Sequence, residues 1–332
     1  MNHTINRRKF IRDSAATCLT LSIPFSAQSG VRKTTGLSLG LIADLHHDIM
    51  HDGYNRLQAF VKEMKKEKPD AIMQLGDFAY PNLKNKNIID LFNNAHSTVL
   101  HVIGNHDTDS GHTYQQCRDI WGIPANYYAK KINGFWVIVL NGNDKGSPLY
   151  KGGYPSYIGE EQLNWLKNTL TEADGPAIVV CHQPLAGVSA VDNAGEVQKL
   201  ISAAKDRVVL VLNGHTHIDS LLYVEDIPYL TINSASYFWV GEKYRHDSYT
   251  KEIHESHKWI SSTCPYRDAL YTVLTINSKK QRIELKGKKS MWVGKSPEAL
   301  GYALRPELEE QKIVPEIIQK TVPLPQDAII PF

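Results

Sequence analysis

Short apolar runs alternate with helical patterns along much of the chain after residue 36. Runs of strand length occupy 37–43, 71–75, 98–103, 177–181 and 208–212, and polar or glycine-containing residues follow each one directly. Between several of these runs, apolar positions recur at helical spacing over 54–66, 159–170 and 196–204. This alternation is typical of βα units built around buried sheets.

The pattern changes after residue 220. Closely spaced strand-like runs occupy 221–224, 229–232, 270–276 and 282–285, with few helical patterns between them. They predict a second, mostly antiparallel sheet. From about residue 289 the chain contains prolines and is only briefly periodic over 306–312. We therefore expect one main domain over 36–288 and a C-terminal extension, 289–332, that packs on it.

Residues 1–35 have a different character. Arg7 and Arg8 are followed by Phe10 and Ile11, and then by an apolar stretch too short to span a bilayer. The segment resembles a twin-arginine export signal, with small residues near position 27 where cleavage could occur. It predicts a bacterial protein exported to the periplasm or beyond. The alternative is a disordered basic tail.

Composition narrows the class of protein. The chain of 332 residues is 42% hydrophobic and 22% charged, which excludes a disordered, fibrous or multi-span membrane protein. Its formal charge of +2 becomes −1 once the four basic residues and one acidic residue of 1–27 are removed. We therefore expect no membrane span and no nucleic-acid-binding surface. The four cysteines form no CxxC pair or disulfide framework.

Polar residues follow five of the predicted strands. Because the carboxyl ends of parallel strands meet at one crevice, we expect these residues to lie together. Their oxygen and nitrogen donors, without a thiolate, suit Mn, Fe, Zn or Ni. Seven donors exceed the needs of one tetrahedral ion, so two ions that share a carboxylate are expected. The donors are Asp44, His46, Asp77, Asn105, His182, His215 and His217.

The local spacing adds two geometric expectations. Asp44 and His46, like His215 and His217, are separated by one residue, so each pair would point the same way on extended backbone. Glycines before Asp77, Asn105 and His215 would form sharp turns that bring the backbone close to the ions.

In their order, these motifs resemble the signature of the calcineurin-like metallophosphoesterase superfamily: D-x-H, G-D, G-N-H-D, a lone H and G-H-x-H, over 44–217. The resemblance implies an α/β fold of two packed mixed β-sheets flanked by helices, in four layers (αββα). It also implies one metal held by Asp44, His46, Asp77 and His217, and another held by Asp77, Asn105, His182 and His215. Tyr80 stands where many members carry a second aspartate that is not a ligand.

The same resemblance implies the activity. A dinuclear site would hydrolyse a small phosphate monoester or diester with a bridging hydroxide as nucleophile and His106 as general acid. Asp107 would orient His106 from behind. Two other functions stay open: a dinuclear metal hydrolase acting on a non-phosphate bond, and a non-catalytic metal-bound module.

Two long loops are candidates for substrate selection. They occupy 144–157 and 237–259, and both are rich in aromatic residues. Aromatic rings together with Lys243 or Arg245 could bind a nucleotide or another organic phosphate. The alternative is that these rings pack the loops onto the domain. Cys181, next to His182, is expected to point to the opposite face of its strand and to pack in the core.

Overall fold

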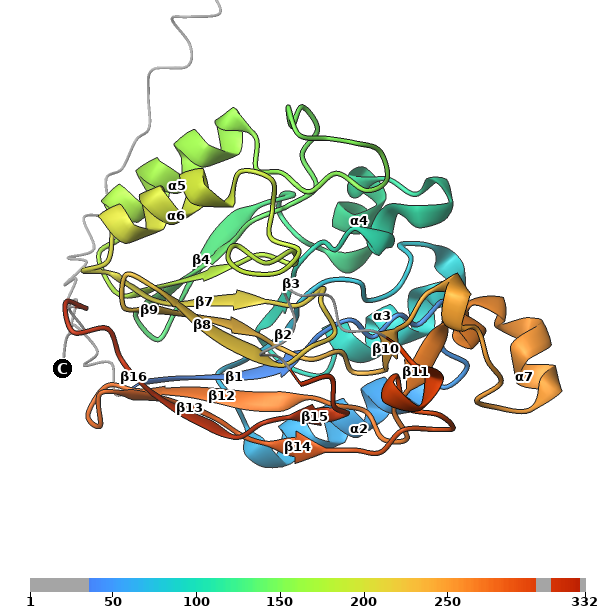
Figure 1. Ribbon diagram of the computed structural model, residues 1–332. Helices are drawn as coiled ribbons and strands as arrows, with labels where there is room; N and C mark the ends of the chain where they lie inside the picture. Colours follow the sequence, from blue (N-terminus) through green and yellow to red (C-terminus); the bar gives the residue numbers. More distant parts are fainter. Residues whose placement is uncertain (1–35, 303–311, 329–332) are drawn as a thin grey trace, which may run out of the picture. The chain divides into compact units, whose positions relative to one another are not determined.

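Two six-stranded mixed sheets dominate the computed structural model, which describes residues 36–302 and 312–328 (Figure 1). The predicted export signal and most of the periodic stretch at 306–312 lie outside the described residues. The first sheet has the order β16-β13-β12-β1-β2-β3, and the second has the order β4-β5-β6-β7-β9-β8.

In the first sheet, three parallel strands adjoin three antiparallel strands. Its strands are β1 (Gly36–Ile42), β2 (Ala71–Gln74), β3 (Val99–His101), β12 (Thr272–Asn277), β13 (Arg282–Leu285) and β16 (Lys320–Pro323). The second sheet has four parallel strands between antiparallel edges. Its strands are β4 (Tyr128–Ile132), β5 (Phe135–Val139), β6 (Ala177–Val180), β7 (Val208–Asn213), β8 (Ser220–Val224) and β9 (Ile227–Thr231).

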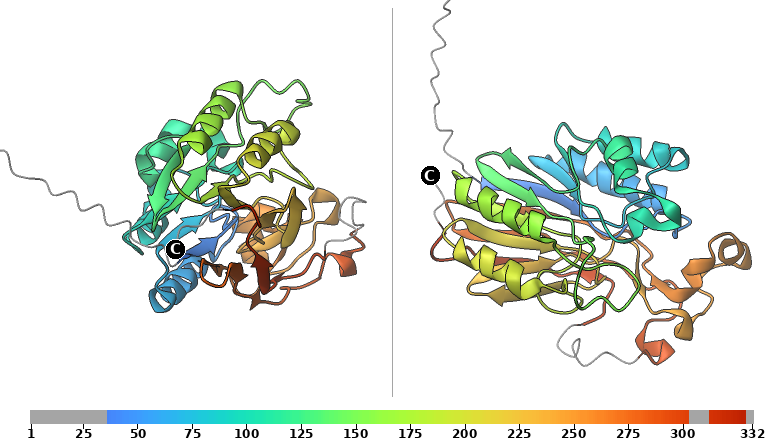
Figure 2. Two further views of the ribbon diagram at one scale, coloured as in Figure 1. Left: turned by 90° about the vertical axis from the view of Figure 1, so that its left-hand side faces the viewer. Right: turned by 90° about the horizontal axis from the view of Figure 1, so that it is seen from above.

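Helices pack on both sheets, as the apolar spacing predicts. The helices are α2 (Gly53–Glu67), α3 (Lys86–Asn93), α4 (Tyr114–Trp121), α5 (Glu160–Glu172), α6 (Ala194–Ala203) and α7 (Lys251–Ser256). Leu57 and Phe60 of α2 share the larger core cluster with buried residues of both sheets. Figure 2 shows α5 and α6 side by side over the second sheet, where Leu166 and Val197 bury their side chains in a second cluster.

Strand β6 shows how one run serves both clusters. Ile178 and Val180 belong to the larger cluster, whereas Val179 and Cys181 belong to the cluster under α5 and α6. This alternation follows from the two-residue period of a strand. It confirms that Cys181 packs in the core, where burial raises the pKa of its thiol to about 12.

The fold class predicted from the sequence is confirmed, but the prediction of a separate antiparallel sheet after residue 220 is wrong. Strands β8 and β9 extend the second sheet beside β7, whereas β12 and β13 join the first sheet beside β1. Apolar spacing identifies a strand, but tertiary packing decides which neighbour it pairs with.

Smaller elements complete the described structure. Two short ribbons join β10 (Tyr237–Trp239) to β11 (Thr263–Pro265) and β14 (Lys288–Lys289) to β15 (Glu316–Ile317). Strand β16, which lies within the predicted C-terminal extension, is an edge strand of the first sheet. Across 36–302 and 312–328, no helix combines the length and the apolar composition that crossing a membrane requires.

Candidate metal centre

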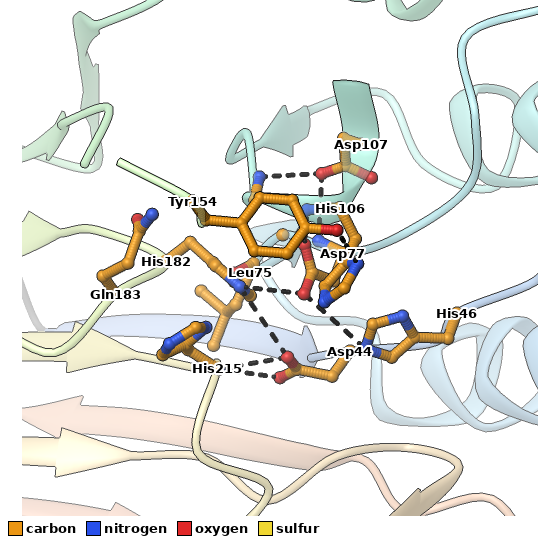
Figure 3. Close-up of polar contacts among 12 residues, drawn as sticks. Asp44, His46, Leu75, Asp77, His106, Asp107, Tyr154, His182, Gln183 and His215 are labelled. Carbon is orange, nitrogen blue, oxygen red and sulfur yellow. Dashed lines mark hydrogen bonds and ion pairs between the residues drawn. The ribbon is translucent and has the colours of Figure 1, made fainter. Parts of the chain in front are cut away.

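The sequence-predicted ligands lie at the carboxyl ends of strands from both sheets, and Figure 3 shows Asp44, His46, Asp77, His182 and His215 close together. Asp44, Asp77 and Asn105 follow β1, β2 and β3, whereas His182 and His215 follow β6 and β7. Six of the seven form two groups, within each of which one ligand atom per residue lies within 4.8 Å of the others. The groups are Asp44, His46 and His217, and Asp77, His182 and His215. The structure therefore offers two neighbouring places for a metal ion.

Five of these residues have left-handed backbone. Their φ angles are 49° at Asp44, 48° at His46, 51° at Asp77, 73° at His215 and 55° at His217. Such residues cost roughly 1–3 kcal/mol each and persist only where the surrounding structure holds them. Extended backbone, the condition under which the Asp44–His46 and His215–His217 pairs would each point one way by strand geometry, is thus not met. Each pair faces the centre through left-handed turns.

Hydrogen bonds between the loops hold this backbone in place. The amide of Asp44 donates to the carbonyl of Gly76 at 3.1 Å, and the amide of His46 donates to the carbonyl of Asp77 at 2.9 Å. The carboxylate of Asp44 in turn accepts a hydrogen bond from the amide of His215 at 3.0 Å. Loops from the two sheets are therefore tied to each other.

The glycines of the motifs stand where a side chain has no room. A Cβ added to Gly104 would lie 2.1 Å from Asp77 Oδ1, and one added to Gly76 would lie 2.3 Å from His182 Nδ1. Of these two, only Gly76 has a positive φ, at 100°. Close packing against the ligands, more than turn geometry, explains why glycine precedes Asn105.

The donor atoms fit a pair of metal ions. His182 Nδ1 donates to the carbonyl of Leu75 at 2.8 Å, which leaves Nε2 free to bind a metal. That buried Nε2 and the buried Oδ1 of Asn105 have no hydrogen-bond partner among the described residues, and a metal ion would satisfy both. Asp77 Oδ2 lies 3.1 Å from His182 Nε2 and 3.6 Å from His46 Nε2, between the two groups. This position suits a shared carboxylate.

Charge in the centre also favours a bound cation. Burial lowers the pKa of His46 to about 3 and that of His215 to about 4, so both imidazoles are neutral ligands at neutral pH. Burial would raise the pKa of Asp77, but His182 and His106 hold it well below its usual range. Burial likewise opposes charge on His182, but Asp77 outweighs it and raises the pKa of His182 to about 10, so a metal ion that binds Nε2 would displace the proton held there. The buried carboxylates thus demand a positive charge beside them, which a metal ion supplies.

His106 lies beside the centre and is oriented by Asp109. His106 Nδ1 donates to Asp109 Oδ2 at 2.8 Å, and the hydroxyl of Tyr154 donates to Asp109 Oδ1 at 2.7 Å. The ring of Tyr154 lies 4.7 Å from the His106 ring between centroids (Figure 3). Burial lowers the pKa of His106, but Asp77 and Asp109 outweigh burial and raise it.

The prediction that Asp107 orients His106 is therefore wrong. The Asp107 carboxylate accepts hydrogen bonds from the amides of Asp77, Phe78 and Gly104, at 2.9, 2.8 and 2.7 Å. Burial and the charge of Asp77 raise the pKa of Asp107 to about 7, while these amide donors favour the carboxylate. Asp107 thus connects the loop after β2 to the loop after β3. Its side chain holds backbone amides rather than an imidazole.

A cavity of about 630 Å³ opens over the centre. Its lining includes His46, Asp77, His215 and His217 from the ligand groups, together with His106. Aromatic side chains from both predicted loops also line it, namely Tyr154, Tyr237, Trp239 and Trp259. Both loops therefore reach the cavity, although a structural role alone was the alternative.

The basic residues of the second loop do not line this cavity. Arg245 Nε donates to Ser261 Oγ at 3.0 Å, and its side chain borders a separate pocket with Lys258. Lys243 lies 5.3 Å above the ring of Tyr244. Neither residue is therefore among the side chains that line the cavity over the metal groups, and the suggestion that Arg245 or Lys243 could pair with a substrate phosphate gains no support from this lining.

Two residues that contact or support His106 were not found from the sequence. Asp109 lies only two positions after Asp107, and a fold of the chain after His106 brings it back to the imidazole. Tyr154 comes from a loop without periodicity, 48 positions after His106 in the sequence. The aromatic content of that loop was the only signal that pointed to it.

Two solved structures show a similar fold at low sequence identity. A dimetal phosphatase from Danio rerio has a TM-score of 0.53 and 15% identity, covering 78% of this chain and 99% of that chain. GAP50, described as the anchor in the inner membrane complex of Plasmodium, has a TM-score of 0.53 and 16% identity, covering 87% of this chain and 89% of that chain. At these identities the likeness concerns the fold alone.

Sequence comparison gives a more specific result. No curated protein matches the chain. The family model described as calcineurin-like phosphoesterase, however, matches residues 37–219, more than half of the chain. This span contains all seven predicted ligands, all of β7, and β1 apart from its first residue, Gly36. The chain belongs to the calcineurin-like phosphoesterase family.

Proposed function

We propose that this protein is a metal-dependent hydrolase of phosphate monoesters or diesters that works at a dinuclear metal site. The observation that carries the proposal is the cavity, where two groups of metal-binding side chains border a histidine held by a carboxylate. Mn, Fe, Zn and Ni suit this set of oxygen and nitrogen donors. When bound, two such ions stabilise charge on the phosphoryl oxygens and lower the pKa of the attacking water.

The proposed ligand assignment follows the two groups. One ion would be held by the first group, Asp44, His46 and His217, together with Asp77, and the other by the second group, Asp77, His182 and His215, together with Asn105. The position of Asp77 Oδ2 between the groups supports its shared role. Carbonyl acceptors fix the imidazoles of His182 and His217 through Nδ1, at 2.8 and 2.7 Å.

His106 is the proposed general acid. Asp109 holds Nδ1, so Nε2 is the ring nitrogen available to protonate the leaving oxygen. The Asp109 carboxylate also stabilises the protonated imidazole before the transfer, because the two charges are opposite and in contact. Asp109 and Tyr154 thereby fix both the orientation and the charge of the acid.

Two other functions compete with this one. A bimetallic centre could hydrolyse another bond, such as a sulfate ester, and a fold of this kind does not by itself imply catalysis. GAP50, for example, is described as an anchor. The hydrogen-bonded pair of His106 and Asp109 favours catalysis, because a scaffold has no need of a positioned acid beside its ligands.

The test is a panel of substrates and metals with the purified full chain. Metal-depleted protein is reloaded with Mn, Fe, Zn or Ni and assayed on 4-nitrophenyl phosphate, bis(4-nitrophenyl) phosphate and 4-nitrophenyl sulfate. We expect turnover of at least one phosphate ester. His106→Ala should retain the metals and lose rate on esters with poor leaving groups, whereas His112→Ala should match wild type. Hydrolysis of the sulfate alone, or of nothing with any metal, would overturn the proposal.

We also propose that residues 1–35 direct the protein through the twin-arginine pathway to the periplasm or beyond. The support is the sequence itself, in which Arg7 and Arg8 precede an apolar stretch. In a bacterial host, a C-terminally tagged chain should fractionate outside the cytoplasm. The Arg7→Lys, Arg8→Lys double variant should stay inside. Identical fractionation of both proteins would refute export by this route.

A further inference from the structure

We infer that the cavity selects phosphodiesters whose retained ester group carries an uncharged aromatic ring, in preference to phosphate monoesters. The inference rests on the proposed phosphoesterase function and names the substrate class for the same site. Three features carry it: an aromatic wall, the charge of the remaining lining, and the position of His106 relative to that wall.

Tyr237, Trp239 and Trp259 form the aromatic wall of the cavity. The ring centroids of Tyr237 and Trp239 lie 6.4 Å apart, as do those of Trp239 and Trp259. Trp239 is 40% exposed and Trp259 is 53% exposed, although tryptophan is highly buried on average. Two exposed indoles inside a cavity offer flat apolar surface to another ring.

The aromatic wall is held in place by backbone pairing. Trp239 lies on β10, opposite Thr263 of β11, and Trp259 lies in the 3-10 turn Lys258–Ser262 that leads directly into β11. The amide of Val240 donates to the carbonyl of Ser262 at 3.0 Å, which extends the pairing. The backbone that carries both indoles is therefore held in place before a substrate binds, and preorganisation of this kind favours affinity.

The charged lining outside the ligand groups disfavours a second negative charge on the substrate. Among the described residues that line the cavity, the charged side chains outside the ligand groups are His106 and the carboxylates Asp48 and Asp109. Asp48 is held in place by the amide of Tyr80 at 2.7 Å. A monoester carries about 1.5 to 2 negative charges at pH 7, whereas a diester carries one. The protonated His106 compensates the charge of Asp109, so the uncompensated carboxylate is Asp48, and its repulsion weighs more heavily on the monoester.

The order of the rings assigns the two ester groups to different ends. The ring centroids of Tyr154 and His106 lie 4.7 Å apart, and those of His106 and His46 lie 5.3 Å apart. The centroids of His46 and Tyr237 lie 5.0 Å apart, so Tyr154 and Tyr237 stand at opposite ends of this series of rings. His106 protonates the leaving group, which therefore lies at the Tyr154 end. The retained group extends past Tyr237 to the two indoles.

The test compares substrates that share one leaving group. The methyl, phenyl and thymidin-5′-yl diesters of 4-nitrophenyl phosphate, together with 4-nitrophenyl phosphate itself, are assayed with the metal-loaded full chain. We expect kcat/KM for the phenyl or thymidinyl diester to exceed that of the methyl diester by about tenfold, the size of a good aromatic contact. The phenyl and thymidinyl arms tell a simple aryl group from a nucleobase. The monoester should be slower than the better of these two.

Matched variants locate the preference. Trp239→Ala and Trp259→Ala should bring the phenyl-to-methyl ratio close to one, and Trp259→Phe should retain most of it. Tyr223→Ala is the control, because Tyr223 is as exposed as Trp259, at 53%, but lies on β8 outside the cavity lining. Arg245→Ala should also leave the ratio unchanged.

A binding experiment gives a readout that needs no turnover. Diphenyl phosphate should quench tryptophan fluorescence at lower concentration than dimethyl phosphate, and the difference should vanish in Trp259→Ala. Equal activity on methyl, phenyl and thymidinyl diesters, or a preference that survives both Trp→Ala changes, would overturn the aromatic assignment. A faster monoester would overturn the diester assignment and leave the proposed phosphoesterase intact. If no phosphate ester is hydrolysed with any metal, the proposed function itself fails.

Discussion

The ligand loops, which are the segments after β1, β2, β3, β6 and β7, and the aromatic wall are built in opposite ways, although all of these loops except the one after β6 line the same cavity as the wall. The loops place polar side chains directly after buried strands, and several ligands have left-handed backbone. The wall consists of a three-residue strand and a 3-10 turn with exposed indoles. The two large sheets thus hold the predicted metal ligands in place. The short β10–β11 ribbon and the turn beside it carry the aromatic rings that are suited to substrate selection. The predictions below test this division.

The largest effect is expected from Asp77→Asn, which disrupts the ligand loops alone. Asp77 lies between the two metal groups and also accepts the amide of His106 at 2.8 Å. We expect loss of bound metal and a fall in kcat/KM of at least about 10³-fold, because both ions lose a charged ligand. Metal analysis and steady-state kinetics measure it. Asp219→Asn, a buried carboxylate paired with Lys320, should keep its metals. Full metal content in Asp77→Asn would contradict the shared role.

Asp109→Ala tests a residue of the loop after β3 that lines the cavity shared with the aromatic wall. Asp109 acts only through His106, whose imidazole it holds. Rate should fall by about 10²-fold for poor leaving groups and far less for 4-nitrophenol, which departs without a proton. Metal content should not change. The measurement is kcat/KM across aryl esters of decreasing leaving-group acidity. An equal loss on every ester would indicate a purely structural role.

Gly104→Ala tests how tightly the ligand loops are packed. The added Cβ would lie 2.1 Å from Asp77 Oδ1 and 2.3 Å from the amide nitrogen of Asp77. We expect a loss of about 1–3 kcal/mol in unfolding free energy, the usual cost of overpacking, and weaker metal binding. Urea unfolding and metal titration measure these effects. Gly195→Ala on α6 is the control, because its Cβ would meet nothing within 4 Å. Identical behaviour of the two variants would argue against tight packing.

A smaller and pH-dependent effect is expected from His101, which supports the ligand loops from behind. Burial lowers the pKa of His101 to about 3. Its Nε2–H donates to Asn93 Oδ1 at 2.7 Å, and its Nδ1 accepts from Gln74, which also accepts the amide of Gly76. Because the unfolded chain binds this proton near pH 6.5, stability should fall as pH drops from 6.5 toward 3.

The size of this loss is about 2 kcal/mol at pH 5 for one such histidine. His101→Gln removes the titration, so the difference in unfolding free energy between wild type and variant should shrink as the pH falls from 7 to 5. Urea unfolding at both pH values measures it, with His112→Gln as the control. Parallel pH dependence in wild type and His101→Gln would contradict the assignment.

Much of the centre was predictable, because apolar runs mark the buried parallel strands and the ligands follow them directly. The partner of His106 was not. The 3-10 segment His106–Gly111 bends at Asp109, with ψ of 164°, and at Ser110, with φ of 58°. This bend returns Asp109 to the imidazole, and spacing alone does not reveal such a bend.

The fold shows the same limit. The run at β12 identifies a strand, but its place beside β1 depends on packing between segments more than 200 residues apart. The β4–β5 hairpin, by contrast, carries a local signal: Asn133 and Gly134 both have positive φ between two strands, as a tight hairpin turn requires. Local chemistry is thus readable in the sequence, whereas contacts between distant segments emerge only in the folded chain.

Left-handed backbone at five ligand positions limits how this centre could be moved to another protein. The dihedral cost falls on the loops, whereas the hydrogen bonds that hold them connect one loop to the next and to both sheets. A peptide that carries Asp44 to His46, or His215 to His217, would relax to ordinary backbone and turn its ligands apart. A designer who wants this metal centre in a new scaffold must therefore graft the adjoining ends of two sheets rather than a set of motifs.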